Sequence, residues 1–221
     1  ATTIDRQCGS SQQAYHFAAQ GVMAGAYDVV IASGVEVMSL VPMGGSIGKN
    51  IGFPFGAAWD RYSEVELLEG NKGLVGQGLS AEIIANEAGL SRADLDAFGA
   101  RSQQLAEAAT EQGRFDNEII PVVSKIRDKE TGAVTVLDTM HTRDEGIRAG
   151  TTAEGLANLK PAFMEDGKVT AGNSSQICDG ASAALIMSAE KAKELGLTPR
   201  AKFRSFALAG VDPVRMLTGP M

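Results

Sequence analysis

The stretch Thr2-Thr-Ile-Asp-Arg-Gln-Cys-Gly-Ser-Ser11 decides the fold class, because it begins a strand, a turn and a helix in quick succession. Residues 2–5 predict a short strand, and Arg6-Gln7 predicts a turn. Small and apolar residues recur at helical spacing from about Gly9 to Gly25. Asp28-Val-Val-Ile-Ala32 is short and β-branched, which is typical of a buried parallel strand. This order predicts a βαβ unit and an α/β fold.

A different pattern begins at Leu40 and continues to about Pro161, where glycine-rich loop, helices and a hairpin predict an inserted or appended domain. Ser91 followed by Asp94 predicts an N-cap for a helix that ends near Gly113. Residues 119–127 and 134–138 are expected to be the two strands of a hairpin whose loop is 128–132.

The α/β pattern resumes after this region. Val169 is expected to return to strand, Ala181–Met187 to form a central strand, and Ala189–Glu194 to form a helix. Residues 201–209 are expected to be extended again.

Composition excludes several classes of protein. A hydrophobic content of 44% over 221 residues is ample for a packed core, and a net charge of −7 disfavours a broad nucleic-acid surface. Two cysteines are too few for a disulfide framework, and no apolar run reaches the roughly 18 residues of a membrane span. A cytoplasmic enzyme with no membrane or nucleic-acid partner fits best.

The ends of the sequence suggest a piece of a longer chain. Ala1 is not an initiator methionine, and no helix or strand pattern closes the chain before Met221. We therefore expect further sequence at both ends.

Cys8 carries the main chemical signal. Its predicted place at a helix start would surround it with backbone N–H groups and a helix dipole that stabilise a thiolate and an oxyanion. The alternative is a buried cysteine that serves as a small hydrophobic residue. The polar neighbours Gln7 and Gly9-Ser-Ser11 favour a nucleophile.

Neither histidine is a good base for Cys8. His16 lies eight residues further along the predicted helix, about 12 Å at 1.5 Å per residue, which is too far for a hydrogen bond. His141 lies in a charged segment that is typical of a solvated surface histidine. The base is expected outside this chain.

No metal or nucleotide triphosphate site is indicated. Gly44-Gly-Ser-Ile-Gly-Lys-Asn50 hints at a phosphate loop, but Met43 and Asn50 stand where the loop needs glycine and Ser/Thr. The cysteines, histidines and acidic residues lack zinc or calcium spacing.

Several stretches in the same order resemble thiolases, and together they span nearly the whole chain. The first is Cys8-Gly-Ser-Ser-Gln-Gln-Ala14, followed by Gly21–Gly25 and Ala32–Ser39. The others are Leu79-Ser-Ala-Glu82 with Leu90-Ser-Arg92 and Gly113–Pro121, then Leu159-Lys-Pro-Ala-Phe163, then Val169-Thr-Ala-Gly-Asn-Ser-Ser175 with Asp179-Gly-Ala181.

The resemblance implies a thiolase fold, with duplicated βαβαβ halves in α/β layers and an inserted loop domain that covers coenzyme A. Residues 1–39 would belong to the N-terminal half, which carries the nucleophile helix, and 169–200 would complete that half. Residues 40–168 would be the loop domain, and 201–221 would begin a largely missing C-terminal half.

The resemblance also implies an activity. Cys8 would form an acyl-enzyme in ping-pong chemistry, either cleaving 3-ketoacyl-CoA with CoA or condensing two acyl-CoAs. No permanently bound cofactor is implied, because the CoA thioester is the substrate. The resemblance further implies a homodimer or homotetramer. It also implies a role in fatty acid metabolism and lipid degradation. The acid and base would be a His and a second Cys near the C-terminus, supported by an Asn, and no matching motif occurs here.

The resemblance also implies CoA-binding roles for residues at matching positions. Arg148 would approach the nucleotide end of CoA, Phe163 would pack on pantetheine, and Ser175 would hydrogen-bond a pantetheine amide near Ala171 and Gly172. Without the resemblance these would be read as a solvated arginine, a core phenylalanine and a turn serine.

The sequence departs from the family at three places. Gly155 stands where many biosynthetic members have Ser, Gly76-Gln77-Gly78 replaces a frequent His-Met-Gly, and Cys178 replaces an Asn. Gly155 would remove one CoA contact, and the other two changes favour a degradative thiolase for longer or bulkier chains. The alternatives are a β-ketoacyl synthase-like condensing enzyme, which would lack the long loop domain, and a non-catalytic CoA-binding relative.

Overall fold

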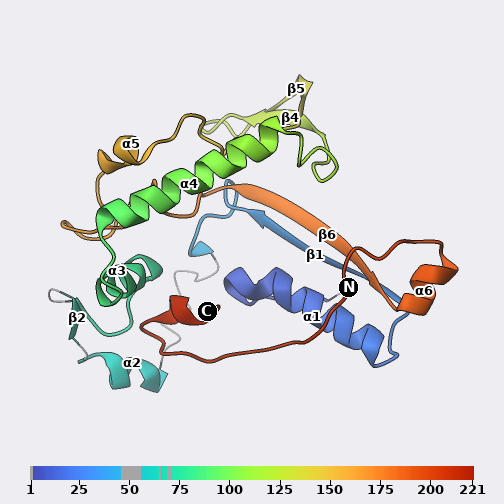
Figure 1. Ribbon diagram of the computed structural model, residues 1–221, viewed down its shortest axis with the longest axis horizontal. Helices are drawn as coiled ribbons and strands as arrows, with labels where there is room; N and C mark the ends of the chain where they lie inside the picture. The colour runs from blue at the N-terminus through green and yellow to red at the C-terminus, as the bar shows by residue number, and fades with distance from the viewer. Residues whose placement is uncertain (1, 46–55, 65, 69–70) are drawn as a thin grey trace. The chain divides into compact units, whose positions relative to one another are not determined.

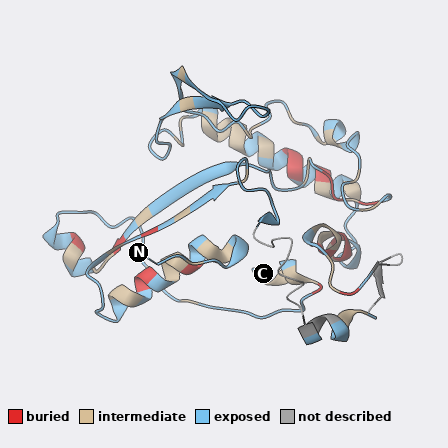
Figure 2. Ribbon diagram, turned by 180° about the vertical axis from the view of Figure 1, so that it is seen from behind, coloured by how far each residue is buried: buried red, intermediate tan, exposed pale blue. Residues whose placement is uncertain are grey.

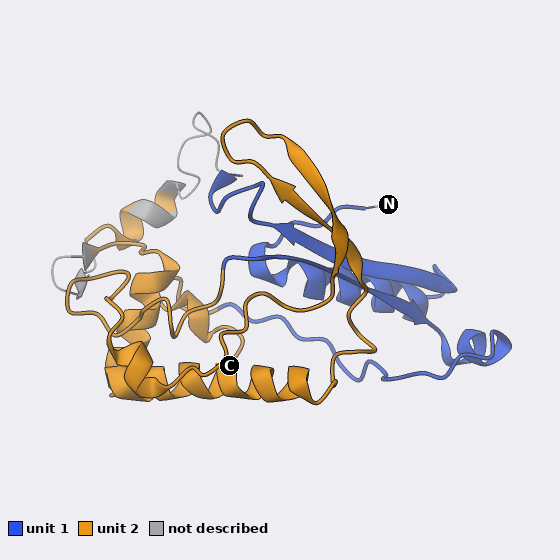
Figure 3. Ribbon diagram, turned by 90° about the horizontal axis from the view of Figure 1, so that it is seen from above, with its two compact units in different colours: residues 1–54, 177–210 blue, residues 55–176, 211–221 orange. Residues whose placement is uncertain are grey.

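The computed structural model describes residues 2–45, 56–64, 66–68 and 71–221. They pack into two compact units, coloured separately in Figure 3. Unit 1 comprises residues 1–54 and 177–210, and unit 2 comprises residues 55–176 and 211–221. The assignment of 1–39, 40–168, 169–200 and 201–221 to parts of a duplicated fold stays a prediction.

Unit 1 is a helix packed on a two-stranded antiparallel sheet (Figure 1). A 3₁₀ turn, η1 (Gln7–Gly9), leads into α1 (Ser10–Met23), and β1 (Val29–Val37) pairs with β6 (Asp179–Met187) along its whole length. A short helix, α6 (Ala189–Glu194), follows β6.

The core of unit 1 lies between α1 and this strand pair. Its buried members are small or branched residues from both, with partly buried aromatic and aliphatic side chains around them: Ala18, Ala19, Ala32 and Ile186, then Tyr15, Val22, Val30, Phe203 and Phe206. Figure 2 shows most of both strands as exposed, so the burial is concentrated on the side that α1 covers.

Three predictions for unit 1 were wrong. The strand predicted over residues 2–5 is absent, so α1 is not the crossover of a βαβ unit. The strand predicted at 28–32 is β1, but it is antiparallel to its partner, because a short β-branched run reads the same in either orientation. Residues 201–209 form no strand; Phe203 and Phe206 instead pack against the α1 core.

Unit 2 contains two larger helices and a hairpin. Its elements are α2 (Gly56–Tyr62), β2 (Glu66–Leu68), β3 (Asn71–Lys72), α3 (Gln77–Glu87), α4 (Arg92–Glu111), β4 (Val122–Arg127), β5 (Val134–His141), α5 (Ala153–Ala157) and η3 (Met216–Thr218). The hairpin β4–β5 and the helix that begins after Ser91 are confirmed, and Ser91 and Asp94 form the predicted capping box.

The predicted strand at Val169 was wrong. The structure has a single antiparallel bridge between Pro161 and Thr170, and the segment after it is irregular. Its backbone N–H groups instead donate to polar side chains. Residues 46–50 of the rejected phosphate loop lie outside the described residues.

Across the part of the chain that the structure describes, no helix is long and apolar enough to cross a membrane.

Candidate active site

Cys8 lies in the 3₁₀ turn η1, immediately before α1, and it is exposed. Exposure contradicts the alternative in which Cys8 is a buried hydrophobic residue, and it leaves the thiol open to a substrate. The predicted helix start is confirmed, whereas the predicted strand before it is absent.

The turn that carries Cys8 is locally strained. Gln7 has a φ of 43°, the single positive φ among non-glycine residues that the structure describes. For a residue with a Cβ, the left-handed conformation with positive φ costs about 1–2 kcal/mol. Strain of this kind persists where surrounding contacts impose it, and it occurs often at functional sites.

Hydrogen bonds around Ser10 impose this conformation. The Ser10 hydroxyl donates to the Gln7 carbonyl at 2.6 Å and accepts from the Arg6 N–H at 2.7 Å. The Gly9 N–H donates to the Arg6 carbonyl at 3.0 Å, and the Gln7 N–H donates to Asp5 Oδ1 at 3.1 Å. Cys8 is therefore presented by a turn whose backbone is fixed on both sides.

The first turn of α1 also lies directly against β1. A Cβ added to Gly34 would overlap the Ser11 hydroxyl, so glycine at this position permits the close approach. The Arg6 guanidinium, before the helix, donates at 2.6 Å to Oε1 of the buried Gln13, which lies farther along α1. These contacts fix where the Cys8 turn sits within unit 1.

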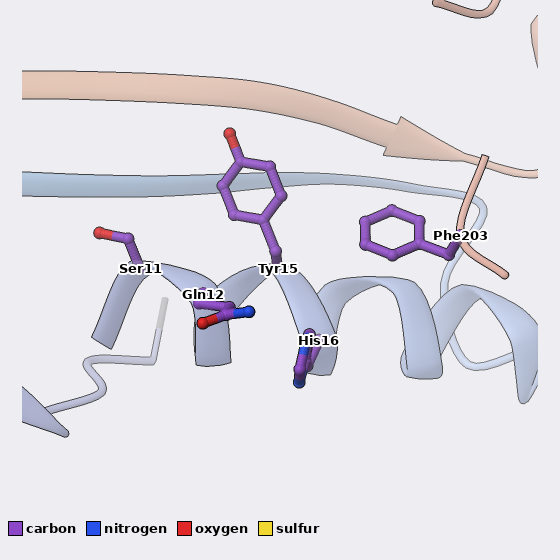
Figure 4. Close-up of a pocket in the computed structure, with 5 residues that line it drawn as sticks. All are labelled: Ser11, Gln12, Tyr15, His16 and Phe203. Carbon is purple, nitrogen blue, oxygen red and sulfur yellow. The ribbon is translucent and has the colours of Figure 1, made fainter. Parts of the chain in front are cut away.

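An open hollow lies beside α1 and is lined by Ser11, Gln12, Tyr15, His16 and Phe203 (Figure 4). Cys8 is not among these residues. The His16 ring meets Phe206 edge to face, with 5.1 Å between ring centroids. His16 is therefore packed against an aromatic ring.

His141 is confirmed as a surface residue. It ends β5, its side chain is exposed, and its Nδ1 lies 3.9 Å from Glu145 Oε1. The second cysteine, Cys178, is also exposed. Accessibility therefore does not distinguish the two thiols, and any difference in reactivity must come from their surroundings.

The predicted CoA residues Arg148, Phe163, Ala171 and Ser175 all lie in unit 2 and are all exposed. Their segments are tied to α4. Gln103 Oε1 accepts from the Arg148 N–H at 2.9 Å, Glu107 Oε2 accepts from the Gly150 N–H at 3.1 Å, and Gln104 donates to the Thr151 carbonyl at 2.9 Å. The loop that carries Arg148 is thus fixed by three polar side chains of α4, Gln103, Gln104 and Glu107.

The Phe163 ring lies on a glycine of α3. A Cβ at Gly78 would overlap the ring, and about half of the Phe163 side chain remains exposed (48%). The ring thus presents an apolar surface to solvent while its position is set by α3. It is not the core phenylalanine of the alternative interpretation.

Sequence reasoning missed two buried carboxylates in unit 2, Glu82 and Asp96, each 1% exposed. A signal was present for Glu82, because it interrupts the otherwise small and apolar run Leu79–Ala85. Asp96 is four residues after Arg92, a spacing that also occurs on solvated helix faces, so it gave no comparable signal. Among the residues that the structure describes, no group of three or more His, Cys, Asp or Glu is placed to hold a metal ion.

Comparison with known proteins agrees with this fold. The family model for the N-terminal domain of thiolase matches residues 1–190. A 3-ketoacyl-CoA thiolase of Marinobacter nauticus is 46% identical over 222 residues, and one of Hahella chejuensis is 47% identical; both alignments cover all of this chain and 52% of the relative. The solved acetyl-CoA acetyltransferase of Syntrophomonas wolfei superposes with a TM-score of 0.75 at 33% identity, covering all of this chain and 52% of that one.

The fold is therefore that of the thiolases, a class of α/β proteins. In this chain the exposed Cys8 lies just before the start of a helix. The chain belongs to the thiolase family. It spans about half the length of the curated relatives that it matches.

Proposed function

We propose that the protein containing this chain is a degradative thiolase that cleaves 3-ketoacyl-CoA with free CoA, and that Cys8 is its nucleophile. The observation that carries the proposal is the exposed Cys8 in a fixed, strained turn at the start of α1. The family membership and the names of the relatives support the substrate class.

The chemistry follows from a thiolate at this position. The Cys8 sulfur attacks the 3-keto carbon of the substrate, and the bond between carbons 2 and 3 breaks. The two-carbon fragment takes up a proton and leaves as acetyl-CoA, while the remaining acyl group is held as a thioester on Cys8. The thiol of a free CoA then attacks that thioester, which releases the shortened acyl-CoA and regenerates Cys8.

The residues of this chain have separate roles in the proposal. The Cys8 backbone N–H, at the positive end of α1, stabilises the oxyanion that forms on the attacked carbonyl. Arg148, Phe163, Ala171 and Ser175 bind CoA, with the arginine at the nucleotide end and the other three along pantetheine. The acid and base that move protons are outside this chain. The cytoplasmic location, the homodimeric or homotetrameric state and the role in fatty acid degradation stay predictions.

A steady-state assay tests the function. The full-length protein that contains this chain is mixed with a 3-ketoacyl-CoA, with and without free CoA, and thioester products are separated by chromatography. We expect continuous formation of acetyl-CoA and a shortened acyl-CoA only when CoA is present, with no more than about one acetyl-CoA per active site in its absence. We expect Cys8→Ser to abolish turnover while the substrate still binds. Condensation without any cleavage would favour the synthase-like alternative, and CoA binding without turnover would favour the non-catalytic one.

A further inference from the structure

Glu82 of α3 holds the backbone of a distant segment. It is buried, and its two carboxylate oxygens accept from consecutive N–H groups: Oε2 from Lys168 at 2.9 Å and Oε1 from Val169 at 2.8 Å. A Cβ at the preceding residue, Gly167, would overlap Glu82 Oε1. The glycine thus allows the chain to approach the carboxylate closely, and the carboxylate satisfies two N–H groups that no strand pairs.

Asp96 of α4 holds the other end of the same segment through Asn173. Asp96 Oδ1 accepts from Asn173 Nδ2 at 3.0 Å, and its Oδ2 accepts from Arg92 Nε at 2.7 Å. Asn173 Nδ2 also donates to the Lys168 carbonyl at 3.0 Å, while its Oδ1 accepts from the Thr170 N–H at 2.8 Å. Asn173 therefore ties the end of the segment to its own beginning.

The middle of the segment is fixed as well. Thr170 is fully buried, and its hydroxyl accepts from the Gly172 N–H at 3.1 Å. Gly172 lies so close to α4 that a Cβ at Gly99 would overlap its carbonyl oxygen. Residues 168–173 are thus held on their buried side by hydrogen bonds and by close packing against α4.

The opposite side of this segment is exposed, and it carries Ala171 and, two residues past Asn173, Ser175. The proposed function places both residues against pantetheine. A buried polar network of this kind fixes backbone geometry more narrowly than apolar packing would, because each hydrogen bond requires a distance and a direction.

We propose that Glu82 and Asp96 are positioning residues that hold segment 168–175 in the shape that presents Ala171 and Ser175 to the pantetheine chain of CoA. This role rests on the proposed function. Neither carboxylate contacts the substrate. Their effect is on CoA affinity, and the chemistry at Cys8 proceeds without them.

Conservative variants of the full-length protein test the role. Glu82→Gln keeps the size of the side chain but replaces one acceptor oxygen by an NH₂ group, which leaves one of the two backbone N–H groups without an acceptor. Asp96→Asn makes the same change beside Asn173. It is the second test variant, for use if Glu82→Gln folds poorly. Glu87→Gln is the matched control, because Glu87 is on the same helix but is exposed and pairs with Arg215.

Three readouts distinguish positioning from general stability: amide hydrogen exchange of residues 168–173, the Kd for CoA, and the rate of Cys8 alkylation. We expect Glu82→Gln and Asp96→Asn to speed exchange in this segment and to raise the Kd for CoA by about 5- to 10-fold, with Cys8 alkylation unchanged. Glu87→Gln should change none of the three.

Two results would overturn the role. Unchanged exchange would mean that the carboxylates do not hold the segment, and faster exchange with an unchanged Kd would mean that its shape does not serve CoA. Wild-type protein that fails to bind CoA would contradict the proposed function as well, so the two failures are distinguishable.

Discussion

Gly34 of β1 and Ser11 of α1 lie so close together that a Cβ on Gly34 would overlap the Ser11 hydroxyl. Ser11 is three residues after Cys8 and lies in the first turn of α1. This contact couples the position of β1 to the position of η1, the turn that contains Cys8.

Gly34→Ala should lower the reactivity of Cys8 without removing the thiol. The added methyl group must displace Ser11 and the first turn of α1, and misplacement of a reacting group by about 1 Å can cost roughly 100-fold in rate. We expect at least a tenfold fall in kcat. The control is Gly180→Ala in the paired strand, where a Cβ would meet no atom within 4 Å. Equal activity of the two variants would show that this contact does not position the turn.

Gly78→Ala should weaken CoA binding by displacing the Phe163 ring. Alanine favours a helix by about 1 kcal/mol over glycine, so α3 itself should not be destabilised. A rise in the Kd for CoA with an unchanged or higher Tm would trace the effect to the ring. Gly76→Ala, where a Cβ has nothing within 4 Å, is the control in the same turn. If both variants bind CoA like wild type, Phe163 does not pack on pantetheine.

Ser175→Ala and Arg148→Ala should each weaken CoA binding while the fold is retained. Loss of one pantetheine hydrogen bond costs about 1 kcal/mol, or roughly fivefold in Kd, and loss of a charged phosphate contact costs somewhat more. Isothermal titration with CoA measures both. The neighbouring exposed residues supply the controls Ser174→Ala and Arg143→Ala. Wild-type affinity in both test variants would refute the placement of CoA on these residues.

Ser39, two residues after the end of β1, lowers the pKa of Asp179 below its ordinary value of 3.8. The Ser39 hydroxyl is the main cause, and the Ser39 N–H, which donates to Oδ1 at 2.9 Å, adds to it. Because the folded-state pKa is lowered, the bonds to the ionised carboxylate stabilise the fold fully above the ordinary pKa. That contribution is lost as the pH falls through the lowered pKa.

Removal of the hydroxyl tests this account. Ser39→Ala should raise the pKa of Asp179 toward 3.8, and the remaining backbone bond should keep part of the shift. A carbon-13 NMR titration of the aspartate carboxyl groups measures it. Ser33→Ala, at an exposed serine within β1, should leave the pKa of Asp179 unchanged. A pKa that does not move in Ser39→Ala would contradict the prediction.

The sequence predicted local elements well where short-range chemistry decides them. Ser91 and Asp94 signalled the start of α4, and the helix predicted over Ala189–Glu194 is α6. The β4–β5 hairpin was predictable because its turn residues lie between two β-branched runs.

Long-range pairing was not predictable in the same way. The orientation of β1 depends on β6, about 150 residues later, and the periodicity of a strand does not encode the direction of its partner. Likewise Val169 resembles the start of a strand, but its N–H is bonded by Glu82, 87 residues earlier. Of the candidate site, the position of Cys8 at a helix start could be predicted, and Glu82 gave a signal as the one carboxylate in a small and apolar run. The strain at Gln7 and the burial of Asp96 could not be predicted.

The central claim is that Cys8 forms the acyl-enzyme, and both cysteines of this chain are exposed, so trapping the intermediate tests the claim most directly. The full-length protein is mixed briefly with a 3-ketoacyl-CoA in the absence of free CoA, quenched in acid, digested, and mapped by mass spectrometry. We predict that the peptide containing Cys8 gains one acyl group, that the peptide containing Cys178 does not, and that added CoA removes the group. An acyl group on Cys178, or substrate cleavage with no acyl group on Cys8, would contradict the account.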